Sequence, residues 1–77
     1  MSAPQTMAVD VRDMLCAQAL AVVGNAIEPL KAGDALDVMY NTEDVKRDLI
    51  IWASDRGYDT RPVSDTALRM TVTLNGI

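Results

Sequence analysis

The hydrophobic pattern changes its period between residues 7 and 30. Met7, Val9 and Val11 alternate with small or polar residues, which is the period of a half-buried strand. Apolar residues then recur at spacings of three and four, which is the period of one helix face. They are Leu20, Val23, Ile27 and Leu30. The segment therefore predicts a short strand that leads into a long helix.

Two residues indicate where this helix begins and ends. Asp13 can cap its start, because a carboxylate accepts the unpaired N–H groups of a first turn. A helix that begins at Asp13 absorbs Cys16 into its first turn. Pro29 has no N–H to donate and disfavours helical geometry at Glu28. We expect the regular helix to stop or bend near Glu28, with Gly33 completing the turn.

The rest of the chain predicts one more helix and three more strands. Residues 36–40 alternate as a strand, and residues 41–44 begin a helix with a capping residue followed by acids. The buried stripe of that helix includes Trp52, and Gly57 is suited to its end. Residues 58–63 form a weak strand that Pro62 restricts to a sheet edge. Residues 68–74 alternate cleanly as the last strand.

This order predicts an α+β fold, a two-layer α/β sandwich with the sequence β-α-β-α-β-β. Both helices pack on one face of a four-stranded mixed sheet, and the other face is polar and partly exposed. A chain of 77 residues is one small domain. We expect residues 6–77 to form that domain and residues 1–5 to be a disordered N-terminal tail.

Charge and cysteine content exclude several classes of function. Eleven acidic against seven basic side chains give a net charge of −4, which argues against direct binding of nucleic acid or an anionic membrane. Apolar runs are too short to span a membrane. The single cysteine, Cys16, excludes an internal disulfide framework and indicates a cytoplasmic protein. Without histidine or a second cysteine we expect no metal site and no cofactor.

Several motifs resemble one known family. Asp10 lies six residues before Cys16, residues 31–38 read Lys-Ala-Gly-Asp-Ala-Leu-Asp-Val, and residues 41–49 read Asn-Thr-Glu-Asp-Val-Lys-Arg-Asp-Leu. Together with the first helical stripe and residues 52–58, these motifs resemble the TusA/SirA family of small sulfur-carrier proteins from Val9 to about Leu74. Family members carry Lys-Pro-Gly-Glu-x-Leu-x-Val and Asp-Asp-Pro-x-x-x-x-Asp-Ile at the two matching segments. The element order agrees with the two-layer fold of that family.

The central motif departs from the family pattern. Members carry Cys-Pro-x-Pro where residues 16–19 read Cys-Ala-Gln-Ala, and Asp13 stands where glycine is usual. Ile50 replaces a frequent proline. The first helix of family members tends to be basic on its exposed side, and Gly24, Asn25 and Glu28 occupy those places here.

The resemblance implies a sulfur carrier rather than a turnover enzyme. Cys16 would accept a sulfane sulfur as a persulfide and relay it to the cysteine of another protein, in routes such as tRNA thiolation, cofactor assembly or sulfur oxidation. The implied partners are sulfur-donor and sulfur-acceptor proteins, and the free chain is expected to be a monomer. A helix start and nearby cations favour a thiolate, so Arg12, Lys46 and Arg47 are the predicted binding residues. In a strand–helix–strand–helix unit both helices begin at one sheet edge, which brings the second helix to Cys16.

Other interpretations stay open on the residues alone. A lone cysteine beside an apolar stripe is often a buried small hydrophobe, which fits a non-catalytic paralogue acting as a protein-binding or regulatory module. Arg12, Lys46 and Arg47 also fit solvated surface charges, and Asp48 fits a structural bond near the second helix start. An RNA-binding module is a third hypothesis, which the acidic charge and scarce aromatic residues disfavour.

Overall fold

Six elements follow one another in the predicted order. They are β1 (Thr6–Asp10), α1 (Cys16–Ile27), β2 (Ala35–Met39), α2 (Glu43–Asp55), β3 (Asp59–Ser64) and β4 (Ala67–Thr71). The computed structural model describes residues 5–72. The predicted tail, apart from Gln5, lies outside the described residues, as do positions 73 and 74 of the predicted last strand.

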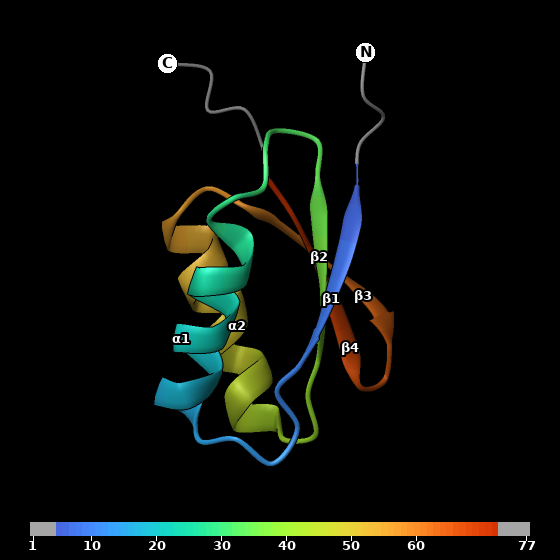
Figure 1. Cartoon of the computed structure of the whole chain (residues 1–77). Helices are drawn as coiled ribbons and strands as arrows, with labels where there is room; N and C mark the ends of the chain where they lie inside the picture. Colours follow the sequence, from blue (N-terminus) through green and yellow to red (C-terminus); the bar gives the residue numbers. More distant parts are fainter. Residues whose placement is uncertain (1–4, 73–77) are drawn as a thin grey trace.

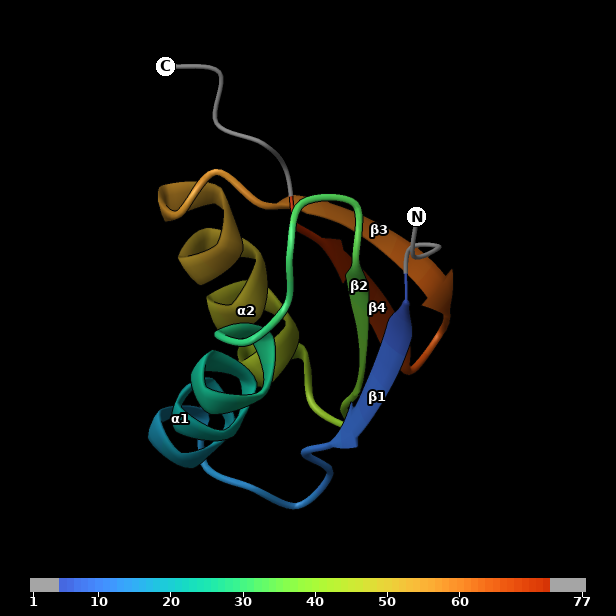
Figure 2. The same cartoon turned by 45° about the horizontal axis from the view of Figure 1, so that its top comes forward.

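The four strands form one mixed sheet in the order β1-β2-β4-β3. β1 pairs with β2 in parallel, while β4 pairs with both β2 and β3 in antiparallel fashion. Both helices cover the same face of this sheet (Figures 1 and 2). The predicted α+β two-layer sandwich is therefore confirmed.

The core lies between the sheet and the helix pair. β2 and β4 supply four fully buried side chains: Leu36, Val38, Leu68 and Met70. Each helix adds three buried residues at helical spacing: Ala19, Val23 and Ile27 from α1, and Val45, Leu49 and Ala53 from α2. Burying an aliphatic side chain of this size stabilises a fold by about 1.5–3 kcal/mol. Trp52, predicted to be buried, is only half-buried and lies beside this core.

The open face of the sheet is polar, as predicted. Arg69 of β4 donates to the Asp37 carboxylate of β2 from Nε at 2.7 Å and from Nη2 at 3.1 Å. Arg61 and Asp59 form a second pair on β3. β3 lies at the sheet edge that Pro62 predicted, and a register shift between Pro62 and Ser64 interrupts its ladder.

Asp34 joins three segments at one end of the sheet. Its carboxylate accepts hydrogen bonds from the N–H groups of Gln5 at 2.9 Å and Lys31 at 3.0 Å. Its carbonyl accepts from the N–H of Val72 at 2.8 Å. These backbone hydrogen bonds hold the pKa of Asp34 below its ordinary value, because they favour the carboxylate. Residues 5 and 72 thus meet at the start of β2.

The helix ends follow local signals. α1 ends at Ile27, two residues before Pro29, as expected. Thr42 caps α2, since its Oγ1 accepts from the N–H of Val45 at 3.3 Å. α2 ends at Asp55, and Gly57 follows with a φ of 80°, a conformation that suits glycine.

Candidate functional site

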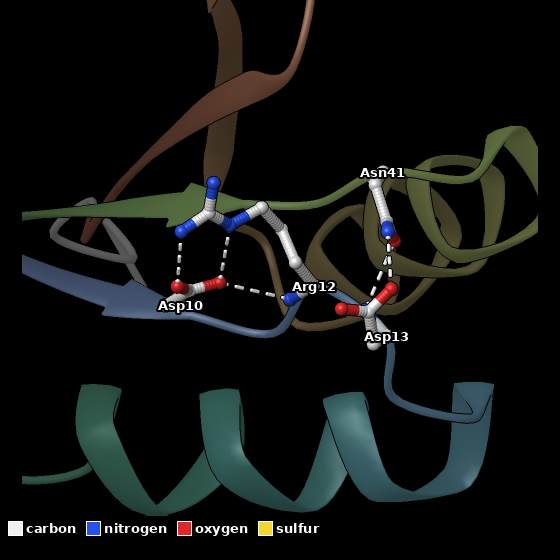
Figure 3. Close-up of polar contacts among 4 residues, drawn as sticks. All are labelled: Asp10, Arg12, Asp13 and Asn41. Atoms are coloured by element: carbon white, nitrogen blue, oxygen red, sulfur yellow. Dashed lines mark hydrogen bonds and ion pairs between the residues drawn. The ribbon is translucent and has the colours of Figure 1, made fainter.

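The connection between β1 and α1 turns on Asp13. Its φ is 66°, and it is the only residue other than glycine with a positive φ between residues 5 and 72. Its N–H donates to Asn41 Oδ1 at 3.0 Å, and Asn41 Nδ2 donates to its Oδ1 at 2.7 Å (Figure 3). Asn41 lies just before α2, so this pair joins the segments that precede the two helices. Asp13 thus adopts a left-handed backbone, a conformation that favours glycine.

The predicted cap of α1 at Asp13 is wrong. The Asp13 carboxylate is engaged by Asn41, and α1 begins three residues later at Cys16. Leu15 is the N-cap residue, with an extended backbone of φ −70° and ψ 157°. The Leu15 N–H donates to Gln18 Oε1 at 3.4 Å. Gln18 is the third residue of the helix, and this hydrogen bond is one of the two that make up a capping box. Cys16 is therefore the first residue of the helix.

The thiol of Cys16 is half-exposed and reduced. It lies where α1 begins, and α2 begins at the same end of the molecule, as predicted (Figure 1). The N-terminus of a helix carries partial positive charge and favours a thiolate. On helix position alone Cys16 would be more acidic than a free cysteine.

Carboxylates of α2 reverse this tendency. The pKa of Cys16 is raised above its ordinary value, chiefly because the Asp48 side chain is its hydrogen-bond partner. Partial burial and the negative charges of Asp48 and Asp44 raise the pKa further, while Arg47 lowers it. The thiolate is thus less favoured than in an unperturbed cysteine.

Arg12 is engaged by a different carboxylate. Its Nε and Nη2 donate to the two carboxylate oxygens of Asp10 at 2.9 and 2.7 Å (Figure 3). The Arg12 N–H also donates to Asp10, at 3.0 Å. Side-chain hydrogen bonding to Arg12 lowers the pKa of Asp10 to about 2, and the same pair raises the pKa of Arg12. Asp10 and Arg12 form one fork immediately before the Asp13 turn.

The two predicted basic residues of α2 differ in their relation to the thiol. Arg47 Nη2 lies 3.3 Å from Asp44 Oδ1, and its charge acts on the pKa of Cys16. Lys46 is half-buried. Neither Lys46 nor Arg12 is among the groups that shift the Cys16 pKa. The binding roles of all three basic residues stay predictions.

Asp48 is the site residue that the sequence analysis placed only in a structural role. A usable signal was present, because Asp44 and Asp48 are four residues apart and so share one side of α2. Since both helices begin at one sheet edge, that side lies next to the start of α1. The charge pattern of α2 therefore pointed to carboxylates beside Cys16.

Residues 5–72 hold neither a metal-binding cluster nor a membrane-spanning helix. No group of three or more histidine, cysteine or acidic side chains is arranged to hold a metal ion there. Within the same residues, both helices are too short or too polar to cross a membrane.

Comparison with known proteins gives one match. A family model described as "Sulfurtransferase TusA" matches residues 7–74. Searches of curated proteins and of solved structures find no match to the chain.

Proposed function

The chain belongs to the TusA sulfurtransferase family, and we propose on this premise that Cys16 carries a sulfane sulfur as a persulfide and relays it to a partner protein. The family supports a sulfur-carrier role, and its members interact with sulfur-donor and sulfur-acceptor proteins in general. We also propose that residues 6–77 form one domain and that the exchange takes place in the reducing cytoplasm. tRNA thiolation is one route in which such a carrier would act.

The proposed transfer needs no external oxidant or reductant. The Cys16 thiolate attacks the outer sulfur of a donor cysteine persulfide, and a new S–S bond forms at Cys16 Sγ. The S–S bond of the donor breaks, and its electron pair leaves on the donor cysteine as a thiolate. The acceptor thiolate then attacks the outer sulfur on Cys16 in the same way, and Cys16 leaves as a thiolate.

The position of Cys16 carries this proposal. Its half-exposed thiol is the first residue of α1, at the end of the molecule where both helices begin. A partner's cysteine can approach such a thiol from solvent. Ala17 and Ala19 stand at the positions of the two family prolines. The helix begins at Cys16 without them.

One observation favours the alternative, a non-catalytic protein-binding module. The raised pKa of Cys16 reduces the thiolate fraction at neutral pH, and the thiolate is the nucleophile. For the carrier, this requires that the donor complex supplies a base or a cation next to the thiol. For the module, the cysteine is only a packed side chain.

Intact-mass measurement separates the two functions. The folded protein is incubated with a cysteine desulfurase and cysteine, or with polysulfide, and the mass is expected to rise by one sulfur atom. Cys16→Ser is the control and should gain nothing. Failure of the wild-type protein to gain sulfur from either source refutes the carrier function and leaves the binding module.

A further inference from the structure

Helix α1 presents an uncharged surface. None of its 12 residues is charged, although Ala17, Gln18, Ala21 and Asn25 are exposed. The preceding Leu15 is 76% exposed. A surface helix of a globular domain normally carries charged residues on its solvent face, and exposed apolar side chains that cluster mark contact sites.

A groove runs between α1 and α2, and we call it the interhelix groove. Its first part is a hollow of about 340 Å³ lined by Leu20, Asp48, Ile51, Trp52 and Asp55. Leu20 and Trp52 also line a neighbouring hollow of about 450 Å³, so the two hollows adjoin at these side chains. Ile51 is 60% exposed at the margin. The groove thus offers apolar surface that the fold itself does not cover.

The margin of the groove on α2 is acidic. Asp44, Asp48, Ile51 and Asp55 follow at spacings of four, three and four, which places them along one side of the helix. Within residues 5–72 neither Asp48 nor Asp55 takes part in an ion pair, whereas Asp44 is paired with Arg47. Asp48 and Asp55 therefore lack a cation within the described residues and can meet cations of another molecule, Asp48 while it also interacts with Cys16.

The far end of the groove carries a positive charge. Arg56 lies over the Trp52 ring, 4.9 Å from its centroid, next to Tyr58. Glu28 lines this hollow as well. The α2 carboxylates that line the groove are Asp55, the last residue of the helix, and Asp48, whose charge acts on the Cys16 thiol.

We propose that the interhelix groove binds a basic, partly apolar segment of the protein that exchanges sulfur with Cys16, an inference that rests on the proposed function. Apolar side chains of that segment contact Leu20 and Trp52, while lysine or arginine side chains meet Asp48 and Asp55. Complementary charge of this kind selects the partner and speeds encounter. A second copy of this chain is a poor occupant, because its own groove carries the same acidic margin and its net charge is −4.

Docking of this kind also acts on the thiol. A cation placed against Asp48 offsets the negative charge that raises the pKa of Cys16. The thiolate fraction then rises when the partner is bound. Sulfur exchange is thereby coupled to docking, and the free protein is protected from reaction with unrelated electrophiles.

Two synthetic helical peptides of equal length, one of leucine and lysine and one of leucine and glutamate, test the proposal. Trp52 is the only tryptophan of the chain, so its fluorescence reports binding in the groove. The lysine peptide is expected to shift this fluorescence saturably, and the glutamate peptide is not. Failure of the lysine peptide to bind, or equal binding of both peptides, overturns the proposal.

Matched charge reversals locate the binding. Asp55→Lys should weaken lysine-peptide binding about tenfold or more, since it places like charges together at the groove. Asp65→Lys, in the exposed turn between β3 and β4, makes the same change in net charge and should weaken binding less than about twofold. Equal loss in both variants shows attraction to net charge alone and refutes the groove.

The inference and the proposed function fail separately. Cys16→Ser should keep lysine-peptide binding while it loses sulfur uptake. Sulfur uptake without peptide binding refutes the groove alone. Peptide binding without sulfur uptake refutes the carrier function, and with it the sulfur-exchanging identity of the partner. Concentration-dependent dimerisation in sedimentation, abolished by Ile51→Ser, identifies a second copy as the occupant and overturns the proposal.

Discussion

Replacing Asp13 by glycine or by alanine measures the cost of the left-handed turn before α1. Both substitutions remove the carboxylate that accepts from Asn41, and both keep the N–H that donates to Asn41 at 3.0 Å. They differ in the ability to adopt a φ of 66°. The comparison of the two variants therefore isolates the backbone.

The expected difference follows from two opposing effects. A side chain with a Cβ costs about 1–2 kcal/mol in the left-handed helical region, a cost that glycine avoids. Glycine loses about 0.4–1 kcal/mol through the greater freedom of its unfolded state. We expect Asp13→Gly to be more stable than Asp13→Ala by about 1 kcal/mol, or by about 4–8 °C in Tm for a domain of this size.

Urea and thermal unfolding followed by circular dichroism provide the assay. The control is the same pair of substitutions at Asp65, whose φ is not positive. There the order should reverse, with alanine the more stable by a few tenths of a kcal/mol up to about 1 kcal/mol. An Asp13→Ala variant as stable as Asp13→Gly would refute a left-handed residue at this turn.

Three further predictions concern the site and its helices. Asp48→Ala should lower the pKa of the Cys16 thiol and speed its alkylation by iodoacetamide at neutral pH, because the hydrogen-bonding carboxylate that chiefly raises this pKa is removed. Asp65→Ala is the control, and equal rates in the two variants would contradict the assignment. The Asp10 pKa of about 2 lies below its ordinary 3.8, so the stabilisation from its pair with Arg12 is complete above about pH 4 and is lost as the pH falls toward 2. Arg12→Gln should return that pKa toward 3.8 in a carboxyl NMR titration, and an unchanged pKa would exclude the fork in solution. Gly24→Ala should stabilise the protein by about 0.5–1 kcal/mol in urea unfolding, since the new Cβ meets the tryptophan ring at an ordinary 3.7 Å; destabilisation would show that the helices pack more closely there.

Most of the fold was predictable because its signals are local. Alternation marked β2 and β4, and their inward residues Leu36 and Met70 are fully buried. Pro29 marked the end of α1, and Thr42 with two acids marked the start of α2. Each of these signals acts within a few residues along the chain, so the sequence alone was enough.

The errors arose where a distant residue decides the outcome. Asp13 has the chemistry of a helix cap, but its carboxylate bonds to Asn41, 28 residues further along the chain. Trp52 lies on the apolar stripe of α2, yet the residue of α1 next to its ring is Gly24, which has no side chain to cover it. Neither outcome can be read from periodicity.

The surroundings of Cys16 were predicted in part. Position and family resemblance made Cys16 the candidate, a role that stays a prediction, and the shared sheet edge predicted that α2 begins next to it. The sign of the charge around the thiol was not foreseen, because Arg47 lies between Asp44 and Asp48 in the sequence and offers the opposite charge. The shared side of the two carboxylates on α2 was the signal that could have decided between them.

The junction at Asp34 has a practical consequence for handling the molecule. Residues 5 and 72 are held together there, at the end of the sheet opposite the start of α1 (Figure 1). An affinity tag, fluorophore or surface tether added at either terminus is therefore joined to the described domain at the end opposite Cys16. A protein immobilised in this way presents its thiol and the interhelix groove outward, which suits both to capture of binding proteins on a sensor surface.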